Sequence, residues 1–421
     1  MAPPLQDWVP FQWPAAWTDP GLLRFVEGTP VNCLLLEEAQ AEVREAAQAR
    51  GFVCPPPVRW QAWRELNWAS PGPLAAIGDG FWPELSQKGG DSEQAGPTGA
   101  PWLDANGWLI AMARARLPEE TALWIRSGPP EDPRAVRWTH YQLALLEAWA
   151  YGACRPLWLF PPHAEALRAG GEEARRGWAA LTGALEWMEA RRAWRRCRTF
   201  ARLAIASDFT GANEYIGSET LLLAARQGIP FTPLERSRVN RAALEGIRAL
   251  VWCDPAPVPA EILDWVRQGG RLMAMPGALK SWKRPAATAP QEHARFLLHA
   301  DGQGVVAEAR AAFDDPWLLA RDSRLIASKQ WDAVRLFNEG SLQWRHAHAP
   351  ERHVVHLLNY TLRPSWNPVS VQTSLPVRRA VFHAPGRAPA PLELRRELGG
   401  LEAALPAFAV YGAVEFESAD G

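Results

Sequence analysis

The stretch from Leu203 to Met275 alternates short apolar runs with helical segments, and this alternation restricts the possible folds more than any other feature of the chain. One helix is expected to begin near Ser218, whose hydroxyl can cap the free amides of the first turn, and to end at Gly228. Another helix is expected over Val258 to Gln268. The apolar runs are expected to be strands, at Leu203–Ala206, Ile229–Pro233, Arg248–Trp252 and Arg271–Met275. Such an alternation predicts a parallel sheet covered on both faces.

The same stretch resembles a known domain. The segments that carry the likeness are IASDFTGANEY, ETLLLAARQGIP, LEGIRALVWCD and WVRQGGRLMAMPG. They resemble the flavodoxin-like, glutamine-amidotransferase-like α/β domain that follows the catalytic barrel in several glycoside hydrolases, such as family 42 β-galactosidases and fucosidase-like uncharacterised hydrolases. The resemblance implies a (β/α) barrel before this domain and a small antiparallel β-sandwich after it.

The chain before this domain is short for a complete barrel. Apolar runs such as Leu74–Ile77 and Ala122–Ile125 predict parallel strands, and about five or six such strands can be counted before residue 196. A complete eight-stranded barrel of the TIM type needs roughly 200 to 250 residues. We therefore expect a reduced barrel, preceded by an irregular arm over residues 1 to 30.

The chain after Trp331 consists of short alternating segments divided by turns, which is typical of a β-sandwich. The segment HVVHLLNYT resembles a strand of the terminal sandwich of these hydrolases. His346 and His348 share one face of their expected strand, but carboxylate partners are missing, so exposed strand histidines are favoured over a metal site. The predicted domains are residues 1–195, a reduced barrel-like domain; 196–328, an amidotransferase-like domain; and 329–421, a β-sandwich domain.

Composition excludes several classes of function. The formal net charge is −1 and no basic stripe is present, which argues against nucleic acid and anionic membranes as partners. Five scattered cysteines show no CxxC spacing, and no phosphate-binding glycine loop occurs, so no metal and no cofactor are expected. The start of the sequence lacks a signal-peptide pattern, and no apolar stretch could span a bilayer, so we expect a cytoplasmic protein.

A glycosidase needs two carboxyl groups on either side of the scissile bond. The resemblance implies glutamates at two strand ends, the first preceded by asparagine, but the first domain contains no Asn-Glu pair. Asp79, directly after an apolar strand, and Asp104, between two tryptophans, are therefore the best catalytic pair. The alternatives are a solvated turn for Asp79 and a helix N-cap for Asp104.

The chain has 23 tryptophans and only five tyrosines. An indole suits the face of a sugar ring, and it suits a protein core equally well. The barrel geometry would bring five of the expected binding residues to the rim with the catalytic pair: Trp82, Trp102, Trp108, Trp124 and Glu131.

The favoured function is hydrolysis of a glycoside, with a galactoside or fucoside as the substrate by analogy. The alternative is a non-catalytic carbohydrate-binding or assembly protein on a degenerate glycosidase scaffold. The polar cluster after the first strand of the second domain, around Asp208 and Glu214, is expected to be structural, because Cys253 lacks the glycines of an amidotransferase nucleophile loop. Self-association is also expected, since the resemblance places the second domain at subunit contacts.

Overall fold

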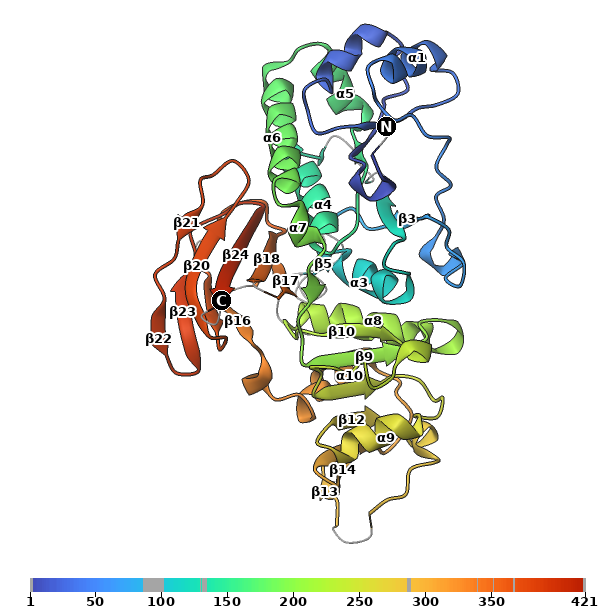
Figure 1. Cartoon of the computed structure of the whole chain (residues 1–421), viewed down its shortest axis with the longest axis vertical. Coiled ribbons are helices and arrows are strands. Elements are labelled where there is room, and N and C mark those ends of the chain that lie inside the picture. The colour runs from blue at the N-terminus through green and yellow to red at the C-terminus, as the bar shows by residue number, and fades with distance from the viewer. Residues whose placement is uncertain are drawn as a thin grey trace.

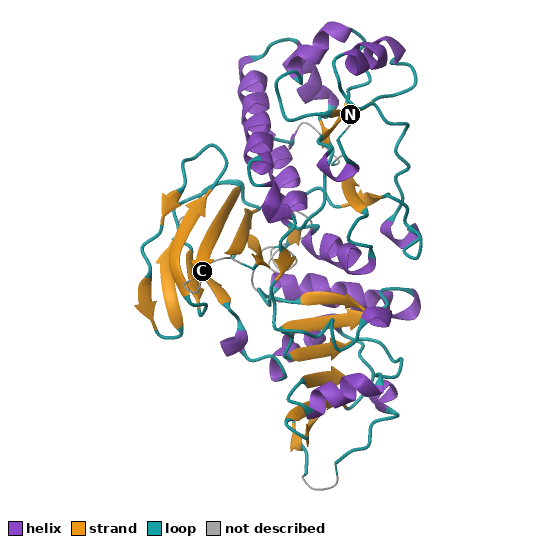
Figure 2. Cartoon of the chain, in the orientation of Figure 1, coloured by secondary structure: helices purple, strands orange, loops and turns teal. Residues whose placement is uncertain are grey.

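The structure is a computed structural model that describes residues 3–85, 102–128, 130, 135–285, 289–338, 340–350, 352–365 and 368–418. It is an elongated α/β protein with several separate sheets (Figure 1). Helices surround short strands in the amino-terminal part, helices flank a parallel sheet in the middle of the sequence, and the carboxyl-terminal part is almost entirely strand (Figure 2). None of the described helices is both long enough and apolar enough to cross a bilayer.

The amino-terminal part contains two groups of parallel strands. In the first group, β1 (Pro10–Gln12) pairs with β2 (Cys33–Leu35) on one side and with β7 (Leu157–Trp158) on the other. In the second group, β3 (Leu74–Gly80) pairs with β6 (Ala122–Ser127). The irregular arm expected for the first 30 residues thus contains β1, the central strand of its sheet.

Three single parallel bridges connect these strands to one another and to their neighbours: Cys33 with Val53, Gln61 with Ile77, and Trp124 with Cys154. The resulting order is Val53, β2, β1, the segment of β7, β6, β3 and Gln61. The members of this series follow one another in the same cyclic order as in the sequence, and β7 lies beside β1. We call this series the open ring, since no pairing between Val53 and Gln61 occurs among the described residues.

Side chains fill the inside of the open ring. Cys33, Leu35 and Trp124 form a buried cluster, and residues from other strands pack against it, including Val53, Trp60 and Cys154. Because these side chains come from most members of the ring, they point toward its common centre. The helices of this part lie in the connections and after β7: α1 (Ala41–Ala49), α3 (Gly107–Arg116), α4 (Trp138–Ala150), α5 (Pro161–Arg168), α6 (Glu172–Glu189) and α7 (Arg192–Arg195).

The middle part is built on one sheet in the order β10-β9-β11-β12-β15-β14-β13. The pairs from β10 to β15 are parallel, and β14 and β13 add an antiparallel edge. The strands are β9 (Leu203–Ser207), β10 (Thr232–Glu235), β11 (Ala249–Trp252), β12 (Arg271–Ala274), β13 (Gln291–Glu292), β14 (Phe296–Asp301) and β15 (Gly304–Ala309). The helices are α8 (Glu214–Arg226), α9 (Ala260–Arg267) and α10 (Pro316–Asp322).

The expectation that Ser218 caps the first helix of this part is wrong. Helix α8 begins four residues earlier, at Glu214, and the Ser218 hydroxyl donates to the Glu214 carbonyl within the helix at 2.6 Å. A serine in a helix interior often bonds back to the carbonyl four residues before it, so a hydroxyl near a helix start does not by itself mark the cap.

The carboxyl-terminal part has two antiparallel sheets, in the orders β16-β19-β23-β22 and β21-β20-β24-β18-β17-β8. Buried apolar side chains from both sheets, such as Leu336, Val371, Val414 and Phe416, form one core between them. Strand β8 (Arg198–Thr199) precedes the middle part in sequence and extends the larger sheet. The other strands are β16 (Val334–Phe337), β17 (Leu342–Ala349), β18 (Arg352–Asn359), β19 (Ser370–Thr373), β20 (Val377–His383), β21 (Ala390–Pro391), β22 (Arg395–Glu397), β23 (Gly400–Ala404) and β24 (Tyr411–Ser418).

Tryptophans hold the larger sheet against the amino-terminal helices. Trp149, Trp187 and Trp194 share a buried cluster with Tyr411, whose ring centroid lies 5.3 Å from that of Trp187. Polar contacts also cross the same boundary. The Tyr360 hydroxyl donates to the buried Glu147 carboxylate of α4 at 2.5 Å, and the buried Arg345 guanidinium donates to several groups outside its own strand.

The strand histidines are not all exposed, which corrects the expectation for them. His346 is only 3% exposed, and its Nε2 lies 3.0 Å from Nδ1 of His353. Since one ring nitrogen must accept, this hydrogen bond requires at least one neutral imidazole. Burial, together with neighbouring positive groups, lowers the pKa of His346 well below its usual value, and burial lowers the pKa of His353 to about 4.

Acidification is therefore expected to destabilise the fold. Both histidines have a lower pKa in the folded chain than in the unfolded chain, so the unfolded chain binds more protons between about pH 6.5 and pH 4. We expect the melting temperature to drop by at least several degrees from pH 7 to pH 4.5, and to drop less in His353→Gln. Thermal unfolding followed by circular dichroism measures this, and an equal drop in both proteins would contradict the role given to this pair.

Candidate carbohydrate site at the carboxyl ends of the strands

A pocket opens at the carboxyl ends of three strands of the open ring. Gln12 is the last residue of β1, Arg126 and Ser127 end β6, and Trp158 is the last residue of β7; all four line the pocket. Parallel neighbouring strands bring these positions to the same edge. The pocket is small and partly open to solvent.

Indole rings form the apolar walls of this pocket. Trp60, Trp82 and Trp158 all line it, and each is partly exposed. Phe160 supports two of them from behind, with ring centroids 5.1 Å from Trp82 and 5.5 Å from Trp158. Rings held in this way offer firm, partly exposed apolar surfaces, the kind of surface on which the C–H face of a sugar can lie.

Two arginines supply the charge of the pocket. Arg155 is 7% exposed, one of its terminal nitrogens donates to the Ser127 hydroxyl, and its guanidinium carbon lies 5.6 Å from the Trp82 ring centroid. The Arg126 guanidinium lies 4.4 Å from the Trp60 ring centroid. Burial lowers the pKa of Arg155 to about 10, which still leaves the guanidinium charged at neutral pH.

Asp79 lies near the end of β3 and is exposed. Its carboxylate accepts a hydrogen bond from the backbone amide of Trp63 at 2.8 Å, at the start of a short 3-10 helix. Asp79 therefore anchors a turn in the described structure, and it is not among the residues that line the pocket.

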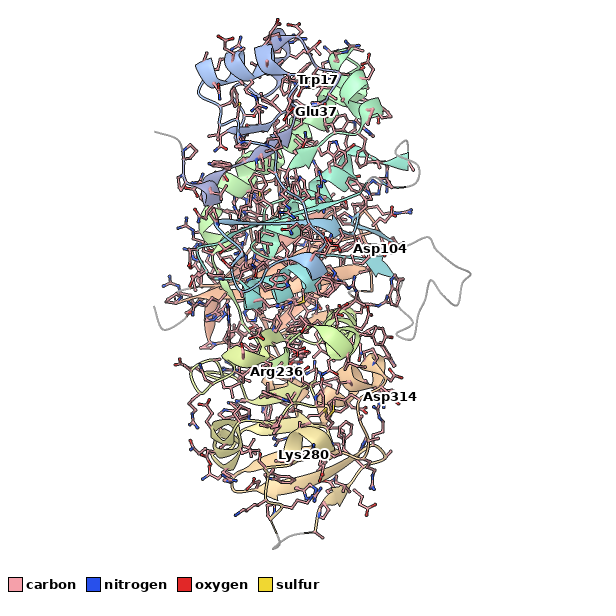
Figure 3. The ribbon with its side chains drawn as sticks, turned by 90° about the vertical axis from the view of Figure 1, so that its right-hand side faces the viewer. Trp17, Glu37, Asp104, Arg236, Lys280 and Asp314 are labelled. Carbon is pink, nitrogen blue, oxygen red and sulfur yellow. The ribbon has the colours of Figure 1, made fainter. Side chains whose placement is uncertain are left out.

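Asp104 lies in the short strand β5 (Leu103–Asp104), which pairs with β4 (Glu84–Leu85). Figure 3 shows it about midway along the long axis of the molecule. The N-cap position of the following helix belongs to Asn106, so Asp104 does not cap that helix. The charge of Asp104 opposes the effect of burial, which lowers the pKa of Arg226 in α8 to about 10.

The expected tryptophans lie in different surroundings. Trp82 lines the pocket, whereas the Trp102 ring is covered by the Arg226 guanidinium, 3.6 Å from its centroid. Trp108 is 6% exposed and packs against Trp63, and Trp124 is 1% exposed inside the open ring. Glu131 lies outside the described residues.

Sequence reasoning missed most of the residues that line the pocket. Arg126 had a recognisable signal, because it directly follows the predicted strand Ala122–Ile125. Gln12 had none, since β1 is only three residues long. Arg155 had none either, since it precedes its strand and owes its place to the contact with Ser127.

A second polar cluster lies at the carboxyl edge of the middle sheet and is centred on Asp254, which is fully buried. Its carboxylate accepts four hydrogen bonds of 2.7 to 3.2 Å. The donors are the Ser207 hydroxyl, the backbone N–H of Asp208, the Asn213 side-chain amide and the Arg236 guanidinium. Arg236, labelled in Figure 3, also pairs with the Asp208 carboxylate at 3.1 Å. The members satisfy one another, which is the arrangement expected of a structural cluster.

Among the described side chains, no group of three or more His, Cys, Asp or Glu residues is placed to hold a metal ion.

No protein-family model matches the sequence, and no curated protein matches it. Several solved glycoside hydrolases are similar to this chain at low identity. An α-L-fucosidase from Paenibacillus thiaminolyticus is 14% identical with a TM-score of 0.46, and the match covers 70% of this chain and 60% of that one. A β-galactosidase from Rahnella sp. R3 is 12% identical with a TM-score of 0.47, covering 74% and 57%. This chain thus spans less than two thirds of the length of either protein.

Proposed function

We propose that the protein is carbohydrate-active and that it binds a sugar in the pocket at the carboxyl ends of β1, β6 and β7. The observation that carries the proposal is the set of three partly exposed indoles, Trp60, Trp82 and Trp158, around one pocket that also holds polar side chains. Indole faces bind the C–H surface of a sugar, and polar groups between them bind its hydroxyls.

Removing one indole is expected to weaken sugar binding. Trp158→Ala should raise the dissociation constant of the best ligand by roughly ten- to a hundred-fold, since an aromatic anchor contributes a few kcal/mol. Titration calorimetry with galactosides, fucosides and glucans measures this. Trp317→Ala is the matched control, because Trp317 is also partly exposed but lies in α10 of the middle part. Equal affinities for both variants and the unchanged protein would contradict the proposed pocket.

Glycoside hydrolysis by Asp79 and Asp104 is the second proposal, because Asp79 is exposed near the carboxyl end of β3, a strand of the same open ring. The two proposals differ in what Asp79→Asn and Asp104→Asn should do. If these carboxylates carry the reaction, each amide should reduce turnover of aryl glycosides about a thousand-fold while sugar binding persists.

If the protein only binds a sugar in the pocket, neither Asp79→Asn nor Asp104→Asn should change sugar affinity by more than a few-fold, because neither aspartate lines the pocket. The melting temperature of each variant serves as the control for folding. Loss of sugar binding in well-folded Asp79→Asn would place the site elsewhere on the rim.

A further inference from the structure

The pocket carries two positive charges, from Arg126 and Arg155, and no carboxylate is found among its described lining residues. No ion pair of the described structure involves either guanidinium. Arg126 instead stacks on Trp60, and Arg155 lies over Trp82. Two like charges that share a partly enclosed pocket repel each other, and a bound anion would offset this repulsion.

Two buried hydrogen-bond donors of the pocket also lack acceptors. Nη1 of Arg155 and Nε1 of Trp82 are inaccessible to solvent and have no partner within the described part of the chain. Arg155 is more than nine-tenths buried, so its free nitrogen cannot be satisfied by bulk water. The buried Glu147 attracts Arg155 electrostatically, but its oxygens already accept from Asn106 and Tyr360.

A ligand that suits these groups has a negative charge and several acceptor oxygens. A carboxylate matches the planar fork of a guanidinium, with two parallel N–H···O bonds. The indoles require in addition an apolar ring face next to that charge. Together these features describe a sugar ring that bears an acidic group.

We infer that the pocket is selective for acidic sugars, with Arg155 and Arg126 binding the anionic group while the indoles hold the ring. This inference rests on the proposed function and adds the class of ligand to it. The anionic group can be a carboxylate, as in a uronate, or a sulfate ester, since both present oxygens to the same donors.

The test compares matched sugars by titration calorimetry on the full chain. Glucuronate and galacturonate are expected to bind at least about tenfold more tightly than glucose and galactose, and added salt should weaken only the acidic ligands. Galactose 6-sulfate distinguishes sulfate from carboxylate as the preferred group. Arg126→Gln should remove most of the difference between uronate and neutral sugar, and Arg126→Lys should restore part of it.

Arg24→Gln is the control, because Arg24 is an exposed arginine that stacks on Phe25 at 4.8 Å and does not line the pocket. It should leave all affinities unchanged. The test uses Arg126 because replacing the buried Arg155 can also unfold the chain.

The outcomes separate this inference from the proposed function. Neutral sugars that bind as tightly as uronates would overturn the inference and leave the proposed pocket intact. Binding of inorganic sulfate without binding of any sugar would overturn the proposed function and leave an anion site. No binding of sugars or sulfate would overturn both.

Discussion

Replacing Asp254 by alanine is expected to lower the free energy of unfolding by about 3–5 kcal/mol, which is typical when one partner of a buried ionic network is removed. The Asp254 carboxylate accepts from four groups, among them the fully buried Ser207 hydroxyl, and the substitution leaves these donors without it. Among the described residues, it also leaves Arg236 with Asp208 as its one remaining ionic partner. Urea unfolding followed by fluorescence measures the loss.

Asp264→Ala is the matched control for this experiment. Asp264 is also an aspartate paired with an arginine, but the pair lies on the surface of α9 and the Asp264 side chain is 60% exposed. Exposed pairs contribute about 0–1 kcal/mol, so the control should lose little. A loss of less than 1 kcal/mol in Asp254→Ala would show that the cluster does not stabilise the edge of the sheet.

Glu147→Ala is expected to cost about 3 kcal/mol or more of unfolding free energy. Glu147 is completely buried in α4, and its oxygens accept from the Asn106 amide at 2.6 Å, the Asn106 side chain at 2.7 Å and the Tyr360 hydroxyl at 2.5 Å. The variant leaves three buried donors unpaired and creates a cavity. Chemical unfolding monitored by circular dichroism tests the expected loss.

Tyr360→Phe separates the boundary contact from the rest of this network. It removes one donor and keeps the ring, so a loss of about 1–2 kcal/mol is expected, clearly smaller than that of Glu147→Ala. Equal losses in the two variants would mean that the contacts to Asn106 contribute nothing, contrary to the geometry. Burial raises the pKa of Glu147, and the hydrogen bonds from Tyr360 and Asn106 act in the opposite direction because they stabilise the ionised carboxylate.

Much of the middle part could be predicted from the sequence, because its strands are continuous apolar runs that become completely buried. β9, β11 and β12 lie within one residue of their expected bounds. β14 was missed, since a polar and Pro-rich stretch precedes it and its pairing with β15 is a tertiary contact. β1 was missed because three residues are too few to show the alternation of buried and exposed side chains that marks a strand.

The candidate site was harder to predict because its features depend on contacts between distant segments. Acidic residues that follow strands were predicted to form the site. In the structure, Asp79 anchors a turn, and the charged residues of the pocket are arginines. The many tryptophans indicate a sugar site only weakly, because an indole can also serve in packing. Trp124 fills the open ring, and Trp187 packs between the helices and the larger sheet. Spacing along the chain does not distinguish these roles.

The buried guanidinium of Arg345 in β17 joins the carboxyl-terminal part to the end of α4. It donates to the Thr199 hydroxyl at 3.0 Å, to the Cys197 carbonyl at 2.7 Å and to the Ala150 carbonyl at the end of α4. If the sandwich moves away from α4, the Ala150 carbonyl loses this donor and the buried charge becomes exposed. We therefore expect the sandwich and the helical part to unfold together, so the order of segments along the chain does not mark where the chain could be cut into autonomous fragments.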